Sequence, residues 1–281
     1  MLFTLRKKIS IGFVLSIPMV TLLLVAFVGP LIIVALYSVM PSGSFDLFHI
    51  PTIENYRKFF ANQYYHSLFI SIYVAFISTV VLLILCYPMA YAMAKIFKKF
   101  SLFITVAIVS LLFISEGVRL YGWVIILMKG GLLDGYLQSW FGASAYSDLL
   151  YNTSATIFGL IYNYFPFMLF PLVQSISGIP EDLRDAARDL GASSKQLFFQ
   201  IDLPLAMPGI IVGSLLTFVF SIGSMAEAEI LGGKKVIMIN YEVQNAFSYA
   251  QNWPLGSAVS MMMIACIVCL LIPIMKMIKA T

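Results

Sequence analysis

Six long apolar runs are the feature of this sequence that most restricts its fold. An apolar stretch of about 20 residues, when helical, matches the hydrocarbon thickness of a bilayer. In lipid the backbone must satisfy its own hydrogen bonds, so such a stretch crosses the membrane as a helix. The sequence therefore predicts an all-α, polytopic membrane protein, a single domain of residues 1–281 with six transmembrane helices. The expected spans are residues 11–38, 67–94, 101–128, 154–178, 205–229 and 256–278.

The composition excludes a soluble monomer. Hydrophobic residues make up 61% of the 281 residues and charged residues 11%, whereas soluble domains are about half apolar and a quarter charged. A chain of this length cannot bury so much apolar surface in a core in water. Its net charge of +4 is too weak and too dispersed for a nucleic-acid surface. We therefore expect membrane lipid around most of the chain and no nucleic-acid partner.

The positions of the basic residues predict how the chain crosses the membrane. An even number of spans places both termini on the same side. Most Lys and Arg residues outside the spans lie on that side, among them Arg6, Lys98, Arg184 and Arg188. Because cytoplasmic loops carry an excess of Lys and Arg, we expect both termini in the cytoplasm.

Between the fourth and fifth runs, residues 180–204 form the one long charged segment. Pro180 followed by acidic residues suits a helix start, and Gly191 suits a helix end. Pro204 then marks the return to the membrane. Apolar residues recur three and four positions apart, as on one face of a short helix: Leu183, Ala186, Ala187 and Leu190. The segment is predicted to be a structured cytoplasmic elbow.

The same segment resembles the EAA loop of ABC importer permeases. The matching residues are Asp185-Ala186-Ala187, then Gly191 after three residues, Ile201 after nine more, and Leu203-Pro204 after one more. Asp185 stands where the family usually has Glu, which keeps the charge. The resemblance implies the type I ABC importer permease fold with a cytoplasmic coupling helix. It also implies that these residues dock on a cytoplasmic ATPase subunit and transmit its closure to the spans.

Shorter matches along the chain are similar to the spermidine/putrescine permease branch. They include Tyr87-Pro88, Arg119-Leu120-Tyr121-Gly122, Gly232-Gly233 and Trp253-Pro254. This resemblance implies a bacterial inner-membrane permease that imports a small solute, in the first place a polyamine, by alternating access. The implied partners are a second permease subunit, two copies of a cytoplasmic ABC ATPase and a periplasmic solute-binding protein. An opine, a phosphonate, ferric iron or another small solute remains an alternative cargo.

The sequence contains no G-x-x-x-x-G-K-[ST] phosphate-binding motif, so the chain is predicted to bind no ATP by itself. We expect a transport subunit rather than an enzyme, with no catalytic residue, no metal and no cofactor of its own. ATP and Mg²⁺ then belong to the partner subunits that the resemblance implies.

Polar side chains inside the spans are the candidates for a substrate path. An ionisable group there costs roughly 2.5–3.5 kcal/mol on insertion scales, so it usually faces a cavity or a partner. Glu116, Arg119 and Trp123 share one helical face of the third span, and Asn163 lies in the fourth. Glu229 is expected to reach outward to the surface. A polar stripe with steps of four, three and three follows the fifth span: Thr217, Ser221, Ser224 and Glu227.

We expect Glu116, Trp123 and Glu227 to line the outer part of a translocation cavity. Carboxylates and an aromatic face suit an ammonium-bearing solute, whereas Arg119 fits an anionic or zwitterionic cargo equally well. A structural ion pair between Glu116 and Arg119, and ordinary helix packing for Asn163, remain open alternatives. A rival class is an ion-coupled secondary transporter that uses Glu116, Arg119 and Glu227 in an ion cycle.

Overall fold

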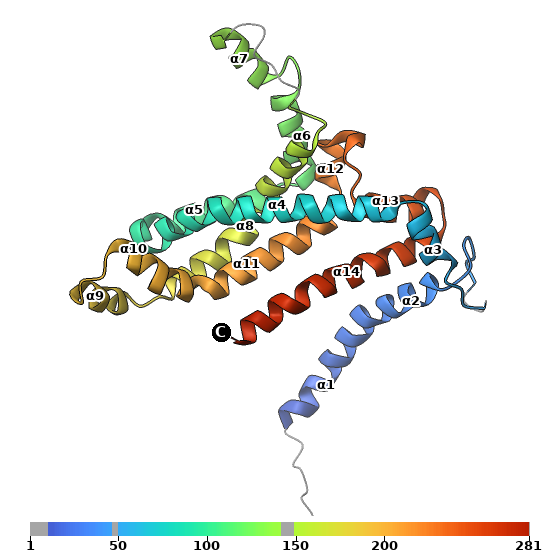
Figure 1. Ribbon diagram of the computed structural model, residues 1–281, viewed down its shortest axis with the longest axis horizontal. Helices are drawn as coiled ribbons and strands as arrows, with labels where there is room; N and C mark the ends of the chain where they lie inside the picture. The colour runs from blue at the N-terminus through green and yellow to red at the C-terminus, as the bar shows by residue number, and fades with distance from the viewer. Residues whose placement is uncertain (1–10, 47–49, 142–148, 281) are drawn as a thin grey trace, which may run out of the picture. The chain divides into compact units, whose positions relative to one another are not determined.

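Every regular element in the computed structural model is helical over the residues that it describes, 11–46, 50–141 and 149–280 (Figure 1). Six helices in these ranges are long and apolar enough to cross a membrane. This confirms the expected all-α class with six spans. The six helices are Ser16–Ser38, Tyr64–Ile96, Glu116–Trp140, Thr153–Ser177, Ser194–Gly223 and Trp253–Pro273.

The chain divides into two compact units, residues 1–64 with 243–281, and residues 65–242. In the first unit, α1 (Ile11–Leu23) continues through a π-helical turn (Leu24–Val28) into α2 (Gly29–Ser38). Pro30 has no N–H to complete the regular hydrogen-bond ladder, and the π turn just before it accommodates this interruption. The first span therefore continues past Gly29 and Pro30.

Two further helices complete the first unit, α3 (Glu54–Ala61) and α14 (Trp253–Ala280). α14 packs against both α2 and α3. Asn55 of α3 is fully buried, and its Nδ2 donates to the carbonyl oxygens of Ser38 and Met40 at 3.2 and 2.7 Å. These bonds satisfy carbonyl groups at the end of α2 and fix the short outer helix on it.

The second unit contains the four inner spans and the elbow. In chain order its helices are α4 (Tyr64–Tyr91), α5 (Lys98–Leu112), α6 (Glu116–Leu127), α7 (Leu132–Phe141), α8 (Thr153–Ser177), α9 (Glu181–Asp189), α10 (Ser194–Leu197), α11 (Leu203–Gly223), α12 (Ala226–Ile230) and α13 (Ile239–Gln244). π-helical turns follow α4 (Ala92–Ile96) and α10 (Phe198–Asp202), and a 3₁₀ turn follows α12 (Gly233–Lys235). The π turn after α13 (Asn245–Tyr249) belongs to the first unit.

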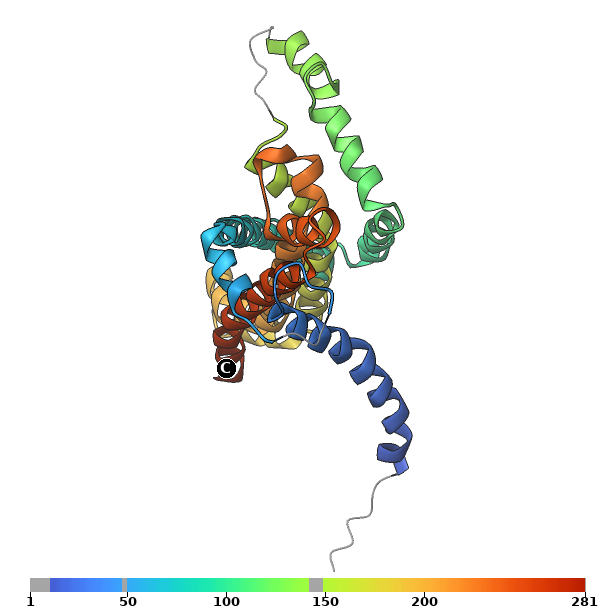
Figure 2. The same cartoon turned by 90° about the vertical axis from the view of Figure 1, so that its right-hand side faces the viewer.

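The core of this unit is built on α8 and α11, which lie side by side in both views (Figure 1 and Figure 2). A Cβ atom on Gly209 would lie 2.5 Å from the carbonyl oxygen of Pro171, and one on Gly213 would lie 3.1 Å from that of Met168. Glycines four residues apart on α11 therefore let the two backbones approach closely, as is common between membrane helices. Buried side chains of α4 and α5, including Leu82 and Ile108, join the same core.

The third span differs from the continuous helix expected over residues 101–128. α5 ends at Leu112, the backbone of Ser115 is extended, and α6 begins at Glu116. In Figure 2, α6 leaves the end of α5 at a large angle. A serine followed by an acidic residue is a helix-start signal, and averaged hydropathy does not register such a signal. The apolar helix of this region long enough to span is Glu116–Trp140.

The fifth span also has other bounds than the expected 205–229. Its helix begins at Ser194, runs through the π turn and ends at Gly223. The Ser224 backbone is extended, and α12 starts anew at Ala226. The stripe from Thr217 to Glu227 is therefore not one helical face, because the helix ends before its last two members.

Candidate functional site

The elbow forms the helix that its end signals predict. α9 runs from Glu181 to Asp189 after Pro180 and carries two acidic residues in its first turn. Gly191 follows with a φ of +85°, a conformation that glycine adopts without strain. The N–H of Gly191 donates to Arg188 O at 2.8 Å, and that of Ala192 to Ala187 O at 3.0 Å. These two bonds form a Schellman cap that satisfies the last carbonyl groups of the helix.

A second short helix leads back to the membrane. Ser193 accepts a hydrogen bond from the Gln196 N–H, and the Gln196 side chain accepts one from the Ser193 N–H. This capping box starts α10. From there the chain stays helical through the π turn into α11, whose first turn contains Pro204. Proline is tolerated there because the preceding π turn already departs from regular bonding.

The coupling residues expected from the sequence lie along this elbow. Asp185, Ala186, Gly191 and Pro204 are exposed, whereas Ala187, Ile201 and Leu203 are half-buried. Two larger apolar side chains accompany them on α9, Leu183 at 47% exposed and Leu190 at 90%. No residue of α9 is buried. The helix therefore presents an uncovered surface that combines apolar and charged groups.

Charged contacts join this elbow to the ends of the neighbouring helices. Lys98 of α5 pairs with Glu181, and the hydrogen bond and charge of the Lys98 ammonium hold the pKa of Glu181 below its ordinary value. Arg184 pairs with Asp202 at 3.3 Å. The pattern of the sequence does not predict the pairing of Arg184 with Asp202. The one signal is an acidic residue two positions before Pro204, at the return to the membrane.

A cavity of about 520 Å³ opens at the break between α5 and α6. It brings together Glu116, Arg119 and Asn163 of the residues predicted for the path. Aromatic residues line it too, and Phe167 and Phe220 pack edge to face 4.9 Å apart. The lining residues are Leu112, Phe113, Ile114, Ser115, Glu116, Arg119, Asn163, Tyr164, Phe167 and Phe220.

Two buried polar atoms in the wall of this cavity have no protein partner. Asn163 is 3% exposed, and its Nδ2 donates to Glu227 Oε1 at 2.7 Å. Its Oδ1, and the Nε of Arg119, have no hydrogen-bond partner within the described ranges. Buried polar groups normally find partners. Two residues that line the cavity thus each contain one buried, unpartnered polar atom, an acceptor in Asn163 and a donor in Arg119, beside the exposed Glu116.

Glu227 lies behind this wall and not on it. It is fully buried, it accepts hydrogen bonds from Asn163 and from the Ser224 hydroxyl, and its carboxyl group interacts with that of Glu116. Thr217 and Ser221 are also fully buried, and the Thr217 hydroxyl donates to Gly213 O at 2.9 Å. These three side chains do not line the cavity.

Trp123 lies elsewhere than predicted, and the Glu116–Arg119 ion pair, which the sequence left open as an alternative, does not form among the described residues. The Trp123 ring packs edge to face on Phe158 at 4.6 Å and on Tyr162 at 5.5 Å, away from the cavity lining. The Arg119 guanidinium lies 5.7 Å from the Tyr162 ring centre. The arginine thus lies over the Tyr162 ring and outside ion-pair distance of Glu116.

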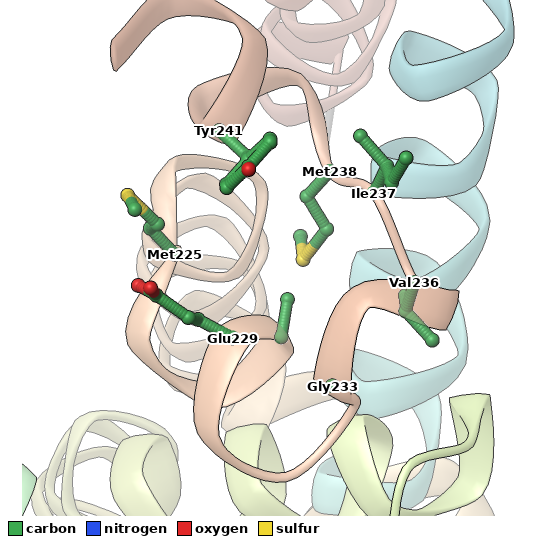
Figure 3. Close-up of a pocket in the computed structure, with 8 residues that line it drawn as sticks. Met225, Glu229, Gly233, Val236, Ile237, Met238 and Tyr241 are labelled. Carbon is green, nitrogen blue, oxygen red and sulfur yellow. The ribbon is translucent and has the colours of Figure 1, made fainter. Parts of the chain in front are cut away.

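A second cavity, of about 390 Å³, lies in the segment after α11 (Figure 3). Figure 3 shows Met225 and Glu229 on one side and Val236 and Ile237 on the other, with Met238 between them. Glu229 is exposed, in line with the expectation that it reaches the surface, and it also borders this second cavity. Glu227 and Glu229 therefore occupy different environments.

Comparison with known proteins identifies the family. The family model for the "binding-protein-dependent transport system inner membrane component" matches residues 9–278. The spermidine/putrescine transport system permease protein PotB of Haemophilus influenzae is 35% identical over 255 residues, covering 90% of this chain and 87% of the relative. PotB of Escherichia coli is 35% identical over 210 residues, covering 74% and 76%.

A solved structure shares the fold. A chain of a bacterial alginate ABC transporter, crystallised with its alginate pentasaccharide-bound periplasmic protein, matches with a TM-score of 0.75 at 15% identity. The match covers 92% of this chain and 90% of that one. The protein belongs to the family of inner-membrane components of binding-protein-dependent transport systems, the permease subunits of ABC importers, and it is a transport component without catalytic function.

Proposed function

We propose that this permease imports a polyamine from the periplasm to the cytoplasm by alternating access. Two relatives about a third identical to it are spermidine/putrescine permeases. The family model runs through both compact units, which supports the proposal that residues 1–281 act as one permease domain. Membership in a binding-protein-dependent family sets aside an independent ion-coupled carrier.

The cavity at the α5–α6 break carries this proposal. The unpartnered Oδ1 of buried Asn163 and the carboxylate of Glu116 both lie in its lining. Both are acceptors, and a primary ammonium is a donor with a positive charge. Phe167 and Phe220 supply an apolar wall for the methylene chain between two amines. Behind the wall, Glu227 accepts a hydrogen bond from the Nδ2 of Asn163, which leaves the Oδ1 of Asn163 as the unpartnered acceptor.

Arg119 favours a second cargo class at the same cavity. Its Nε is an unused donor, which suits the carboxylate of a zwitterionic solute such as an opine. The cation–π contact with Tyr162 holds its charge to one side of the site. The positive charge of Arg119 repels a polyamine bound beside it. A zwitterion instead pairs its carboxylate with Arg119 and its ammonium group with Glu116.

For coupling, we propose that α9 docks on a cytoplasmic ATPase subunit. Its exposed apolar side chains, Leu183 and Leu190, and the carboxylate of Asp185 form the contact surface. One such elbow on each of two permease subunits accounts for two ATPase copies, which hold ATP and Mg²⁺. The docking places the elbow in the cytoplasm and, with six spans, both termini on the same side.

The test is uptake of labelled spermidine and putrescine into vesicles that contain the reconstituted importer and its binding protein. We expect uptake that requires ATP and is competed by unlabelled polyamines. Glu116→Gln is expected to lower it about tenfold, the scale of a lost charge-assisted hydrogen bond, whereas Glu229→Gln, outside this cavity, is the matched control. Competition by opines, phosphonates or ferric iron instead would reject the polyamine, and uptake without ATP would reject the importer cycle.

A further inference from the structure

One half-buried arginine, Arg184, connects the elbow to two membrane helices. Arg184 is 12% exposed, whereas Asp185 and Arg188 on the same helix are 64% and 56% exposed. Its Nη2 donates to the Tyr91 hydroxyl, and its guanidinium lies 5.5 Å from the centre of the Tyr91 ring. Its Nε lies 3.3 Å from the Oδ1 of Asp202, which is 3% exposed. Arg184 therefore points from α9 toward the membrane.

The two partners of Arg184 stand at the ends of different spans. Tyr91 is the last residue of α4, and a π turn follows it directly. Asp202 is the last residue of the other π turn, immediately before α11. π turns inside helices are frequent at functional sites. The arginine thus joins the elbow to the second and the fifth span at positions where both helices depart from regular geometry.

Polar contacts are what holds α9 in place. None of its own residues is buried, so apolar packing contributes little to its position. Besides Arg184, two polar contacts lie near the N-terminus of α9. One is the Lys98–Glu181 ion pair, whose side chains are 55% and 56% exposed. The other is the hydrogen bond from Lys95 Nζ to Ile179 O, at 2.7 Å. Exposed pairs are weakened by water and salt. The Arg184–Asp202 pair, with side chains 12% and 3% exposed, is therefore screened less than the Lys98–Glu181 pair.

We propose that Arg184, Asp202 and Tyr91 form a tether through which a movement of α9 reaches α4 and α11. The inference rests on the proposed docking of an ATPase subunit on α9. A charge pair in a buried site is little screened, and parting it leaves two uncompensated charges. The elbow and the ends of both spans consequently move together as a rigid body. Arg184 and Asp202 are positioning residues for coupling and do not contact the cargo.

The experiment measures the transmission of movement without depending on the cargo. In the reconstituted importer, with the three native cysteines replaced by Ala, the exposed Phe113 at the cavity is changed to Cys. Labelling by a membrane-impermeant maleimide is compared between the nucleotide-free and the ATP–vanadate states, and ATP hydrolysis is measured on the same samples. With the native tether we expect the labelling rate to differ about tenfold between the states, a usual scale for coupling between sites.

Three tether variants and one control decide the outcome. Asp202→Asn and Tyr91→Phe are expected to reduce the state-dependent difference while ATP hydrolysis continues. Arg184→Met with Asp202→Leu removes both charges without leaving one unpaired, so it keeps the fold if Asp202→Asn fails to assemble. Arg188→Ala, which breaks the exposed pair on the same helix, is expected to behave as the native protein.

The possible failures can be told apart. A tether variant that labels like the native protein overturns the tether and leaves the docking of α9 intact. If the double variant loses both ATP hydrolysis and the labelling difference, Arg184 and Asp202 have a structural role only. That result overturns the tether as well. A native complex without any labelling difference, or without a bound ATPase subunit, overturns the proposed docking and the tether with it.

Discussion

At the scale of single residues, the hydroxyl groups of Ser78 and Thr217 bond to backbone oxygens of their own helices, whereas the larger polar side chains bond between helices. Asn163 of α8 bonds to Glu227 of α12, and Arg184 of α9 bonds to Tyr91 of α4. Trp123 is on the same helix as Glu116 but packs on α8 instead of facing the cavity. The polar groups that remain available to bind a solute are the exposed carboxylate of Glu116 and the unpartnered Oδ1 of Asn163.

We predict that Glu227→Ala impairs uptake and that Glu229→Ala does not. Loss of the Glu227 carboxylate leaves the Asn163 amide buried without its acceptor, which costs about 1–3 kcal/mol and releases a side chain of the cavity wall. Glu229 is exposed, so its replacement is expected to change stability by no more than about 0.5 kcal/mol. Uptake and thermal unfolding in detergent measure both effects, and equal effects of the two changes would contradict the distinction.

At the scale of elements, close backbone contact and helix breaks shape the unit that holds the cavity. Gly209 and Gly213 bring α11 against α8. The break before Glu116 opens the cavity lining, and the end of α11 at Gly223 frees Ser224 and Glu227 to turn inward. A continuous third helix would fill the space that the cavity now occupies.

We predict that Gly209→Ala destabilises the protein, because the new Cβ would lie 2.5 Å from a backbone oxygen of α8 that cannot move alone. Overpacking of this kind costs about 1–3 kcal/mol. Gly122→Ala is the matched control, since nothing lies within 4 Å of a Cβ on Gly122 of α6. Thermal unfolding of both variants in the same detergent checks the difference, and equal midpoints would refute the close contact.

At the scale of the whole molecule, each compact unit is stabilised by its own contacts, and the surface of α9 remains uncovered. That surface is where an assembly is expected to apply force. The Lys98–Glu181 pair and the Arg184–Asp202 pair hold the helix from the membrane side only. The chain is a transport component without catalytic function, and the uncovered surface of α9 is where we propose that an ATPase subunit docks.

We predict that Leu190→Asp weakens the binding of the ATPase subunit about tenfold or more, because a charge replaces an apolar side chain at the centre of the docking surface. Leu190 is 90% exposed, so the permease itself is expected to remain stable. Co-purification of the ATPase subunit with the permease measures the effect, with the exposed Lys195→Ala as control. Undiminished co-purification would place the docking surface elsewhere.

Much of the architecture was predictable from local sequence patterns. Hydropathy located six spans, and end signals located α9, whose N-terminal Pro180 and C-terminal Gly191 are both confirmed. The third span was wrong in its bounds, because averaging over an apolar window hides the helix start at Glu116. The polar stripe of the fifth span failed for a similar reason, since helical periodicity was extended past the helix end at Gly223.

The sequence alone determined the membrane surroundings, the helical class and the family, because length, apolarity and helix-end chemistry act within one segment. Only the tertiary structure decided which polar groups meet. Asn163 and Glu227 are 64 residues apart, and no periodicity relates them. Their pairing, like that of Arg184 with Asp202 and the opening of the cavity at the α5–α6 break, depends on how separate helices pack. Packing is set by contacts between segments, and those contacts exist only once the chain has folded.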